Sequence, residues 1–270
     1  IFRSDKEILQ ECKDLVDNGS KEITLLGQNV SSYGYKGKKL SDLIIKISSI
    51  DELKRIRYTT SHPIDFDEDL IKIHGSLKKL MPLIHLPIQS GSDKILKSMN
   101  RKHTVEYYFD LIDKFKKINP SIKFSSDFII GYPGETEKDF NDTLKLIKKV
   151  EFINTYSFIY SPRPGTPAAK MKNIDSLILK ERLVKFQKLA TEIKIKYKKS
   201  LLRKKCEILF ENRIGSGDRF FGRDEYFNSV IVKSKENLKG MLKKVIITGG
   251  NQNTLFGEVL SKMKTTEFAA

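Results

Sequence analysis

Five short segments combine hydrogen-bonding side chains with the glycines and prolines of tight turns. In chain order they are GQNVSSYG (27–34), SHP (61–63), QSGSD (89–93), GYPGE (131–135) and SPRPGTP (161–167). Amide, hydroxyl and carboxylate groups bind polar ligands, but turns favour the same residues for conformational reasons. One such segment is weak evidence on its own, whereas five of them favour a binding site for a polar ligand.

The segment SSDFIIGYPGET (125–136) allows two interpretations. Strand-like residues lead into Gly131, and Thr136 with Asp139 has the spacing of a helix capping box. The junction could cradle a ligand at the N-terminus of the following helix, or it could be a tight turn and nothing more. Glu135 is expected to cap or order this turn rather than to act as an acid or base.

The chain has two cysteines and four histidines. Cys12 and Cys206 are far apart and cannot form a CxxC metal site, and Cys12 lies in an apolar helical pattern that favours core packing. No histidine or carboxylate cluster has the spacing of metal ligands, so no metal site is predicted. His62 could stabilise a turn or contact a substrate, while His74 and His103 are expected on helix surfaces.

The composition is strongly basic. Fifty Lys and Arg residues against 34 Asp and Glu give a net charge of +16 and a pI near 9.6. This balance favours a polyanionic partner, with nucleic acid first, although a lysine-rich composition alone would give the same total. No run approaches the ~20 apolar residues of a membrane span and no signal peptide opens the chain, so we expect a cytoplasmic protein without a membrane partner.

Strand and helix patterns alternate along the first 200 residues. Strand-like runs lie at 22–26, 56–60, 83–88, 123–130 and 155–160, and helical patterns at 40–50, 66–75, 92–118, 136–150 and 175–200. The alternation predicts an α/β fold of parallel βα units. A helix beginning at Ser4, with Glu7 completing a capping box, has no strand before it, so we expect a partial, open βα barrel without its first strand. The active site of such a barrel is built on the loops that follow the strands.

Alternation within three of the strands predicts a polar interior. The residues expected to line the inside are Arg57, Thr59, Ser61, His85, Gln89, Thr155, Ser157 and Ser161. Tyr156, Phe158 and Tyr160 are expected to pack on the outer helices. A polar interior implies a ligand there.

A different pattern begins near residue 201. Short strand-like runs (CEILF, RFFGR, SVIVK, LKKVIITG and LFGEV) follow one another without helices between them. They predict a small all-β barrel of five strands at 201–262, after a βα domain at 1–200 and before a tail at 263–270.

A basic segment precedes this barrel. Residues 178–205 hold eleven Lys or Arg and two Glu. The segment could be a solvated helix surface. Together with Arg219, Phe221 and Arg223 of the barrel, it could also contact phosphates and stack bases.

Taken together and in order, five segments resemble the tRNA methylthiotransferases of the radical S-adenosylmethionine (SAM) superfamily. They are LLGQNVSSYG (25–34), TTSHP (59–63), LPIQSGSDKILKSMNR (86–101), SSDFIIGYPGET (125–136) and YSPRPGTPAA (160–169). The resemblance covers essentially the whole chain and is greatest to the branch that methylthiolates isopentenyl-adenosine beside the anticodon. The terminal barrel resembles the TRAM module that these enzymes use to hold tRNA. A sister branch acting on threonylcarbamoyl-adenosine shares two of the motifs.

The resemblance implies a transferase that uses S-adenosylmethionine and [4Fe–4S] clusters. A radical made from the cofactor would remove hydrogen from C2 of the adenine, a second cluster would supply sulfur, and a second S-adenosylmethionine would supply the methyl group. The partners would be tRNA and an electron donor such as a flavodoxin or ferredoxin. The CxxxCxxC loop and the amino-terminal domain of the family do not occur in this sequence, so the chain is expected to be an inactive fragment.

The resemblance also implies roles for individual residues. Cofactor contacts are expected from Gly27, Gln28, Asn29, Ser61, Gln89, Ser90, Asp127 and Gly131. The segment 27–29 would meet the methionine end of the cofactor, Gln89 and Ser90 the ribose, and Gly131 the adenine. Substrate contacts are expected from Arg163, Arg219, Phe221 and Arg223, although Arg163 could equally be a rim residue. No residue is assigned a catalytic role.

Two functions of other classes remain open. The chain could be a non-catalytic RNA-binding protein with a degenerate barrel, in which only the basic helix and the terminal barrel act. It could also be an unrelated βα-barrel enzyme for a phosphorylated metabolite, which would not need residues 201–270 for RNA.

Overall fold

The computed structural model describes residues 2–59 and 62–260. Ser61 and the proposed tail at 263–270 therefore lie outside the described residues. The chain divides into two compact units, Ile1–Ile195 and Lys196–Ala270, and the division falls inside a long helix, α7 (Ser176–Lys199). We describe each unit by itself.

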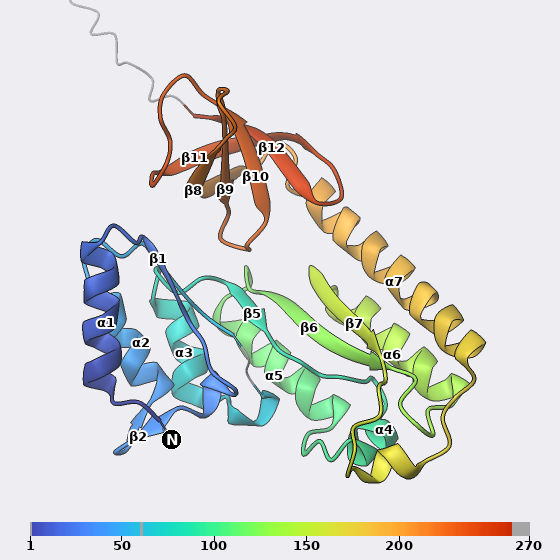
Figure 1. The fold of residues 1–270 in the computed structure, drawn as a ribbon. Helices are drawn as coiled ribbons and strands as arrows, with labels where there is room; N and C mark the ends of the chain where they lie inside the picture. The colour runs from blue at the N-terminus through green and yellow to red at the C-terminus, as the bar shows by residue number, and fades with distance from the viewer. Residues whose placement is uncertain (1, 60–61, 261–270) are drawn as a thin grey trace, which may run out of the picture. The chain divides into compact units, whose positions relative to one another are not determined.

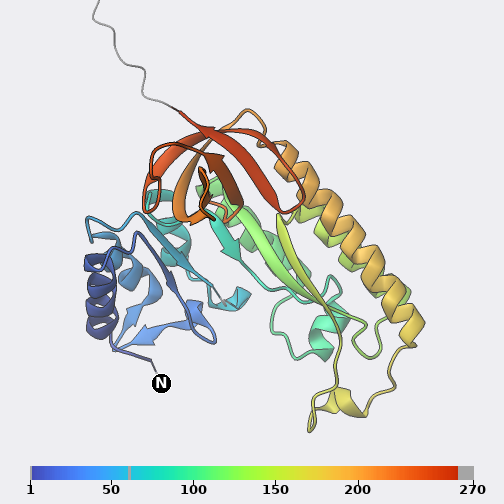
Figure 2. The same ribbon diagram turned by 45° about the horizontal axis from the view of Figure 1, so that its top comes forward.

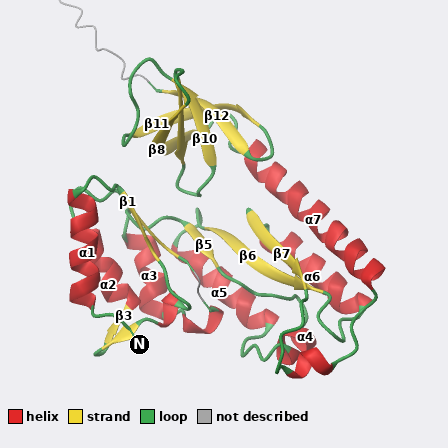
Figure 3. Cartoon of the chain, viewed as in Figure 1, coloured by secondary structure: helices red, strands yellow, loops and turns green. Residues whose placement is uncertain are grey.

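The N-terminal unit is built from parallel strands alternating with helices, as the sequence predicts (Figures 1 and 3). The strands are β1 (Glu22–Leu25), β4 (Arg55–Tyr58), β5 (Leu83–His85), β6 (Lys123–Ile130) and β7 (Asn154–Ile159). β1 pairs with β4, and β5, β6 and β7 pair in that order. A parallel bridge from Ile56 to Leu80 joins β4 to the segment that leads into β5. The strands therefore follow their chain order, which is the arrangement of a βα barrel.

Helices connect these strands. They are α1 (Asp5–Asp17), α2 (Leu40–Ser48), α3 (Glu68–Ser76), α4 (Asp93–Ser98), α5 (Val105–Ile118), α6 (Glu137–Val150) and α7. The predicted capping boxes at Ser4 and Thr136 are both present. The single helix predicted over 92–118 is two helices, because Asn100 adopts a positive φ of 58° and Thr104 caps a new helix. Two short strands, β2 (Gly34–Tyr35) and β3 (Lys38–Lys39), carried no signal that we recognised.

The core of this unit lies between the strands and the helices. Phe124 and Phe128 of β6 are fully buried with Tyr108 and Phe115 of α5 and Phe140 of α6. Alternate residues of a strand point to opposite faces. The other face of β5, β6 and β7 carries His85, Ser125, Asp127, Tyr156 and Phe158. We call this face the open face.

The prediction for β7 was wrong about direction. Tyr156 lies beside Asp127 and Phe158 beside Ile129, so both aromatic rings stand on the open face, where they are 54% and 60% exposed. Ser157 points the other way, toward Gln187 of α7, with 3.5 Å between the hydroxyl and the amide. The sequence alternation was correct, but alternation does not say which of the two faces is covered.

The C-terminal unit is a closed barrel of five strands, which Figure 2 shows turned by 45° about the horizontal axis from the view of Figure 1. The strands are β8 (Lys205–Ile214), β9 (Arg219–Arg223), β10 (Ser229–Lys233), β11 (Leu242–Gly250) and β12 (Thr254–Val259). A Cβ atom at Gly222 would lie 2.5 Å from the carbonyl oxygen of Leu209, and one at Gly257 would lie 2.6 Å from that of Ile246. The two glycines therefore let neighbouring strands pass close to each other in a small barrel.

No helix within the described residues is long and apolar enough to cross a lipid bilayer.

Candidate functional site

Gln89 has an unusual backbone conformation in the segment that follows β5. Its φ is +77°, a region that residues other than glycine avoid. Two backbone hydrogen bonds to β6 hold it there: its N–H donates to the carbonyl of Asp127 and its carbonyl accepts from Ile129, both at 3.0 Å. Gln89 is 8% exposed, and its side-chain amide has no hydrogen-bond partner among the described residues. Strain of this kind occurs at sites that must present a side chain in one position.

The rest of the QSGSD turn is fixed to α6. Gly91 lies so close to this helix that a Cβ atom would be 2.5 Å from the Cα of Thr143, and its N–H donates to the Thr143 hydroxyl at 2.9 Å. The Ser92 hydroxyl donates to Asp139 at 2.7 Å. Ser90 is 1% exposed and its hydroxyl accepts from the backbone N–H of Ser92. Glycine and serine thus hold the turn, which leaves Gln89 as its free polar group.

A small polar group lies next to Gln89 on the open face. The carboxylate of Asp127 is 3.4 Å from Nε2 of His85, and Nδ1 of His85 is 3.0 Å from the Ser125 hydroxyl. The ring of Tyr156 meets the His85 ring edge-on, with 6.1 Å between centroids. As the strand pattern predicts, His85 and Asp127 face away from the helices. Because both ring nitrogens of His85 have partners, the group that remains for a further contact on this face is the Asp127 carboxylate.

Arg101 is a candidate site residue that the sequence reasoning missed. Its guanidinium is partly buried and forms no hydrogen bond or ion pair with any described residue. Burial lowers its pKa, and the charge of Asp127 acts in the opposite direction. An arginine so placed is suited to bind an anion such as a carboxylate. The available signal was its place at the end of LPIQSGSDKILKSMNR, directly after Asn100 with its positive φ.

Asn29 connects the first two predicted turns. Its Oδ1 accepts from the backbone N–H of His62 at 3.2 Å, and its amide donates to Asp65 at 2.5 Å. Gly27 and Gln28, beside it, are exposed. The His62 ring in turn packs edge-on against the ring of His103, 5.4 Å away in the segment that follows α4.

The remaining turns are connected in the same way. The Lys94 ammonium, just after the QSGSD turn, donates to the carbonyl of Gly134 at 2.9 Å. The rings of Tyr132 and Tyr160, at the starts of the fourth and fifth turns, are 5.1 Å apart. Together with the contacts of Gln89, these place the five turns along one edge of the strands, as predicted.

The GYPGE turn packs against α7 and bonds to residues of the protein itself. Gly131 has a φ of +74°, and a Cβ atom there would lie 1.9 Å from the Cδ2 atom of Leu179 in α7. Glu135 accepts from the Gly131 N–H at 3.2 Å and pairs with Arg182 at 2.8 Å. Burial raises the pKa of Glu135, and Arg182 opposes this rise. Glu135 therefore orders the turn, as expected, and the expected contact of Gly131 with a nucleoside stays a prediction.

Arg163 lies in the fifth turn, where it is exposed. Its carbonyl accepts from the Thr166 hydroxyl at 2.8 Å, a bond that shapes the turn. The expected role of its side chain in binding phosphate or carboxylate is untested.

The substrate residues predicted in the barrel lie near one another. The guanidinium of Arg223 lies 5.2 Å from the Phe221 ring centroid and 4.2 Å from that of Phe227, and its Nε is 3.0 Å from Glu211. Arg219 is exposed on the same strand, β9. Phe227 is 42% exposed and was not among the predicted residues.

The predicted surface positions of His74 and His103 are wrong, since each is 4% exposed. Apolar periodicity assigned them to helix surfaces, but His74 binds the Tyr58 hydroxyl at 2.7 Å inside the core.

Both cysteines are buried, and burial raises the thiol pKa of Cys206 to about 12. No group of three or more His, Cys, Asp or Glu side chains within the described ranges could hold a metal ion.

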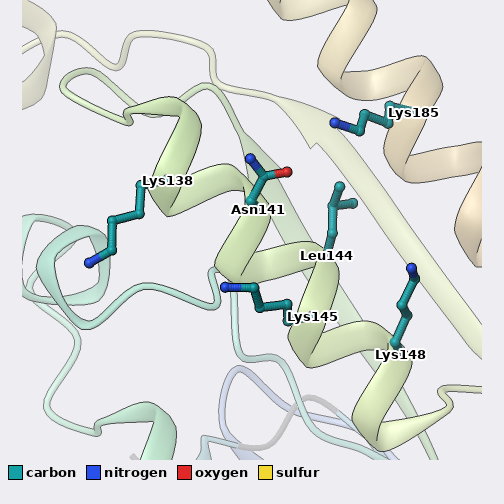
Figure 4. A pocket seen from close by; sticks show the side chains of 6 residues that line it. All are labelled: Lys138, Asn141, Leu144, Lys145, Lys148 and Lys185. Atoms are coloured by element: carbon teal, nitrogen blue, oxygen red, sulfur yellow. The ribbon is translucent and has the colours of Figure 1, made fainter.

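A lysine-rich hollow of about 660 Å³ lies on the helix side of the unit (Figure 4). Figure 4 shows it between α6 and α7, lined by Lys138, Asn141, Leu144, Lys145, Lys148 and Lys185. Its walls are largely the aliphatic stems of lysines, and Lys145 pairs with Asp142 at 3.0 Å. The lining residues belong to the helices rather than to the turns, so the hollow is separate from the site.

Comparisons with known proteins agree with this geometry. The model of the radical SAM superfamily matches residues 1–147. The chain is 53% identical over 262 residues to the tRNA-2-methylthio-N(6)-dimethylallyladenosine synthase of Pelagibacter ubique, covering 96% of this chain and 59% of that protein. It is 46% identical over 258 residues to the synthase of the same name from Wolbachia pipientis (strain wPip), covering 93% and 59%.

Among solved structures, coproporphyrinogen III oxidase (HemN) from Escherichia coli, a radical SAM enzyme, matches with a TM-score of 0.52 at 12% identity. The match covers 82% of this chain and 60% of that one. It shows a shared fold and no more. The chain spans about three fifths of the length of the two synthases.

Proposed function

The chain belongs to the radical SAM superfamily, and we propose that the protein to which it contributes transfers a methylthio group to C2 of N6-dimethylallyladenosine in tRNA. The observation that carries the proposal is the 53% identity to a synthase of that name over 96% of this chain. The ordered edge of turns supports it, because a radical SAM barrel binds its cofactor at such an edge.

S-adenosylmethionine fits the groups along this edge. The cofactor carries an amino group, a carboxylate and ribose hydroxyls, which need both donors and acceptors. Gln89, whose backbone N–H bonds to the carbonyl of Asp127, offers an unpartnered amide, and Arg101 offers an unpaired guanidinium. We assign the ribose to Gln89 and the carboxylate to Arg101. We keep Gly27, Gln28 and Asn29 for the methionine end, with Ser61, Ser90 and Gly131 as further contacts.

In this proposal Asn29 also positions the segment that meets the methionine end of the cofactor. Its amide already binds Asp65 and the backbone of His62, so it fixes the first turn against the second. Gln28 beside it remains exposed and available for direct contact. The bound cofactor supplies the methyl group and the radical precursor of the reaction, while the chain orients it and limits the access of water.

An iron–sulfur cluster does not fit the described residues of this chain. A [4Fe–4S] cluster is held by several thiolates, and the two cysteines, Cys12 and Cys206, are buried in different units. We therefore expect the cluster ligands outside this sequence. A flavodoxin or ferredoxin as electron donor, and a cytoplasmic setting, complete the proposal.

The terminal barrel is proposed to act as a TRAM module that holds tRNA. Arg223 stacked on Phe221 and Phe227 combines a cation with aromatic faces, which is the combination that binds single-stranded RNA. Arg219 and Arg163 would contact phosphates. Replacing Arg219 and Arg223 by alanine should lower tRNA affinity and reduce its salt dependence. An unaltered salt dependence would remove the barrel from the interface.

Nucleoside mass spectrometry tests the function directly. tRNA from cells without the complete gene should lose 2-methylthio-N6-dimethylallyladenosine and accumulate N6-dimethylallyladenosine, and a plasmid copy should reverse both changes. If both nucleosides stay at wild-type levels, the proposal is wrong. If a different methylthiolated nucleoside disappears instead, the reaction class stands and the substrate is wrong.

A further inference from the structure

Two large aromatic side chains stand exposed on the open face beside the proposed cofactor site. Tyr156 is 54% and Phe158 is 60% exposed, although they occupy one short strand of a well-packed unit. Large apolar groups are mostly buried in folded proteins, and exposed ones that lie side by side mark binding surfaces. The small polar Ser157 between them faces α7 instead. The strand thus directs its aromatic rings away from the core.

The Tyr156 ring is held from one side. His85 meets the Tyr156 ring edge-on, and His85 is itself fixed by Asp127 and Ser125. Phe158 is paired in register with Ile129, two residues beyond Asp127. Alternate residues of a strand are about 6.6 Å apart along its axis, so two neighbouring rings offer one continuous apolar surface.

The charges around this surface restrict what can lie on it. Asp127 is adjacent to Tyr156 in the register of β6 and β7, and a carboxylate repels the phosphates of an RNA backbone. The surface therefore suits the uncharged part of a nucleotide. Gln89 hydrogen bonds to the backbone of Asp127, so the surface is continuous with the proposed cofactor site.

From these contacts we propose that Tyr156 and Phe158 form the platform on which the substrate base lies. The adenine stacks on one ring, and its branched, apolar N6 substituent lies over the other. Enzymes that act on a base take it out of the stack and bind it between apolar and aromatic side chains. The inference rests on the proposed function and adds to it a pair of residues that select the modified base over plain adenosine.

The test uses the complete, cluster-loaded enzyme and two forms of one tRNA, with N6-dimethylallyladenosine or with adenosine at the target position. Tyr156→Ala and Phe158→Ala should each lower kcat/KM for the dimethylallyl form by about 10-fold or more, since stacking on one aromatic ring has that magnitude. The ratio of kcat/KM for the two tRNA forms should fall more in the variant that removes the ring under the N6 substituent than in the other variant. Tyr156→Phe should restore most of the loss.

Matched controls separate this role from a structural one. Ser157→Ala changes the opposite face of the same strand, and Tyr107→Ala removes an exposed aromatic ring (39% exposed) from α5. Both should keep the wild-type preference between the two tRNAs. Cofactor affinity and melting temperature should change little in the platform variants, because the two rings are largely outside the core.

The outcomes are distinct. If both platform variants keep the wild-type kcat/KM and preference, the inference is wrong and another segment covers this face. If overall tRNA affinity falls equally for both tRNA forms, the face contacts RNA without selecting the base, and the inference is also wrong. If the wild-type enzyme methylthiolates neither tRNA, the proposed function itself fails and the inference falls with it.

Discussion

Two turns of the N-terminal unit each place glycine between a strand and a helix, and they differ in whether their polar side chains have partners. In the QSGSD turn, the side chain of Gln89 has no partner, and Arg101 farther along the same segment has none either among the described residues. In the GYPGE turn, Glu135 and Arg182 form a buried ion pair that joins the turn to α7. The first turn leaves an amide and a guanidinium without partners, which is why we propose that it binds a ligand, whereas the second uses its polar groups to hold the fold.

The difference shows that glycine in a strand-to-helix turn does not by itself indicate a ligand. Gly91 is required because α6 is close, and Gly131 because its φ is positive and Leu179 is close. What separates the two turns is the state of their side chains: a nearly buried amide and a guanidinium without partners, against a satisfied ion pair.

The largest expected effect is on the ion pair of the second turn. Arg182→Ala would leave Glu135, whose side chain is 1% exposed, without its counter-charge. Breaking a buried pair from one side costs about 3–5 kcal/mol of unfolding free energy. Urea unfolding measures this loss, and the double variant Arg182→Ala with Glu135→Gln should recover part of it. A loss below that of a typical surface substitution would show that the second turn is not structural.

The Glu135–Arg182 pair also predicts that the stability of the fold depends on pH. Burial raises the folded-state pKa of Glu135 above its value in the unfolded chain. A carboxyl group of this kind binds more protons in the folded state, so its contribution to stability falls as pH rises through that pKa. Without Arg182 the pKa should rise further. The destabilisation of Arg182→Ala should therefore be smaller in mildly acidic than in neutral buffer, and an equal loss at both would contradict the assignment.

The second largest loss of unfolding free energy is expected on replacing the two glycines. In Gly91→Ala the new Cβ meets the backbone of α6, with Thr143 Cα at 2.5 Å, and backbone cannot move aside cheaply. In Gly131→Ala it meets the end of the Leu179 side chain, which can rotate, although the positive φ remains strained. We expect a loss of about 3 kcal/mol for Gly91→Ala and about 1–2 kcal/mol for Gly131→Ala. Urea unfolding of both decides the order, and the reverse order would mean that α6 yields more readily than α7.

Much of the fold could be predicted because its signals are local. Strand alternation and the capping boxes at Ser4 and Thr136 depend on neighbouring residues, and the structure contains them as predicted. The break between α4 and α5 was missed because the left-handed conformation of Asn100 is not marked by a glycine.

The site was predicted less completely, because which polar side chains pair with one another is decided only in the folded chain. Arg101 lies at the end of a motif and Arg182 lies in the long helix α7, and nothing in the sequence says that Glu135, 47 positions from Arg182, pairs with only one of them. The direction of Tyr156 and Phe158 was missed for a similar reason. Which face of β7 is covered depends on where α7 packs, and the period of the strand is the same in either case.

A smaller effect is expected at Gln89. Gln89→Gly removes the cost of a φ of +77° and also removes the amide. Unfolding free energy should rise by about 1 kcal/mol, because glycine adopts this conformation without strain. Affinity of the complete, cluster-loaded protein for S-adenosylmethionine should fall by about fivefold, the worth of one hydrogen bond.

This opposite response is the sharpest mark of a ligand-binding turn. Calorimetric titration with S-adenosylmethionine and urea unfolding measure the two quantities independently. If stability falls together with affinity, the conformation of Gln89 serves the fold, and the distinction between the two turns is lost.

The smallest effect on stability is expected at Arg101, the counterpart of Arg182. Arg101→Gln keeps a similar shape but removes a partly buried charge that has no partner among the described residues. Unfolding free energy should change by less than about 0.5 kcal/mol, since removing a charge that has lost water without gaining a partner costs nothing. Cofactor affinity should fall by about 10-fold or more, since charge-assisted hydrogen bonds to a carboxylate are the stronger kind. Arg101→Lys, which keeps the charge and loses the two-pronged geometry, should lie between. A stability loss like that of Arg182→Ala would show that Arg101 is paired within the fold, and the two turns would then differ in degree only.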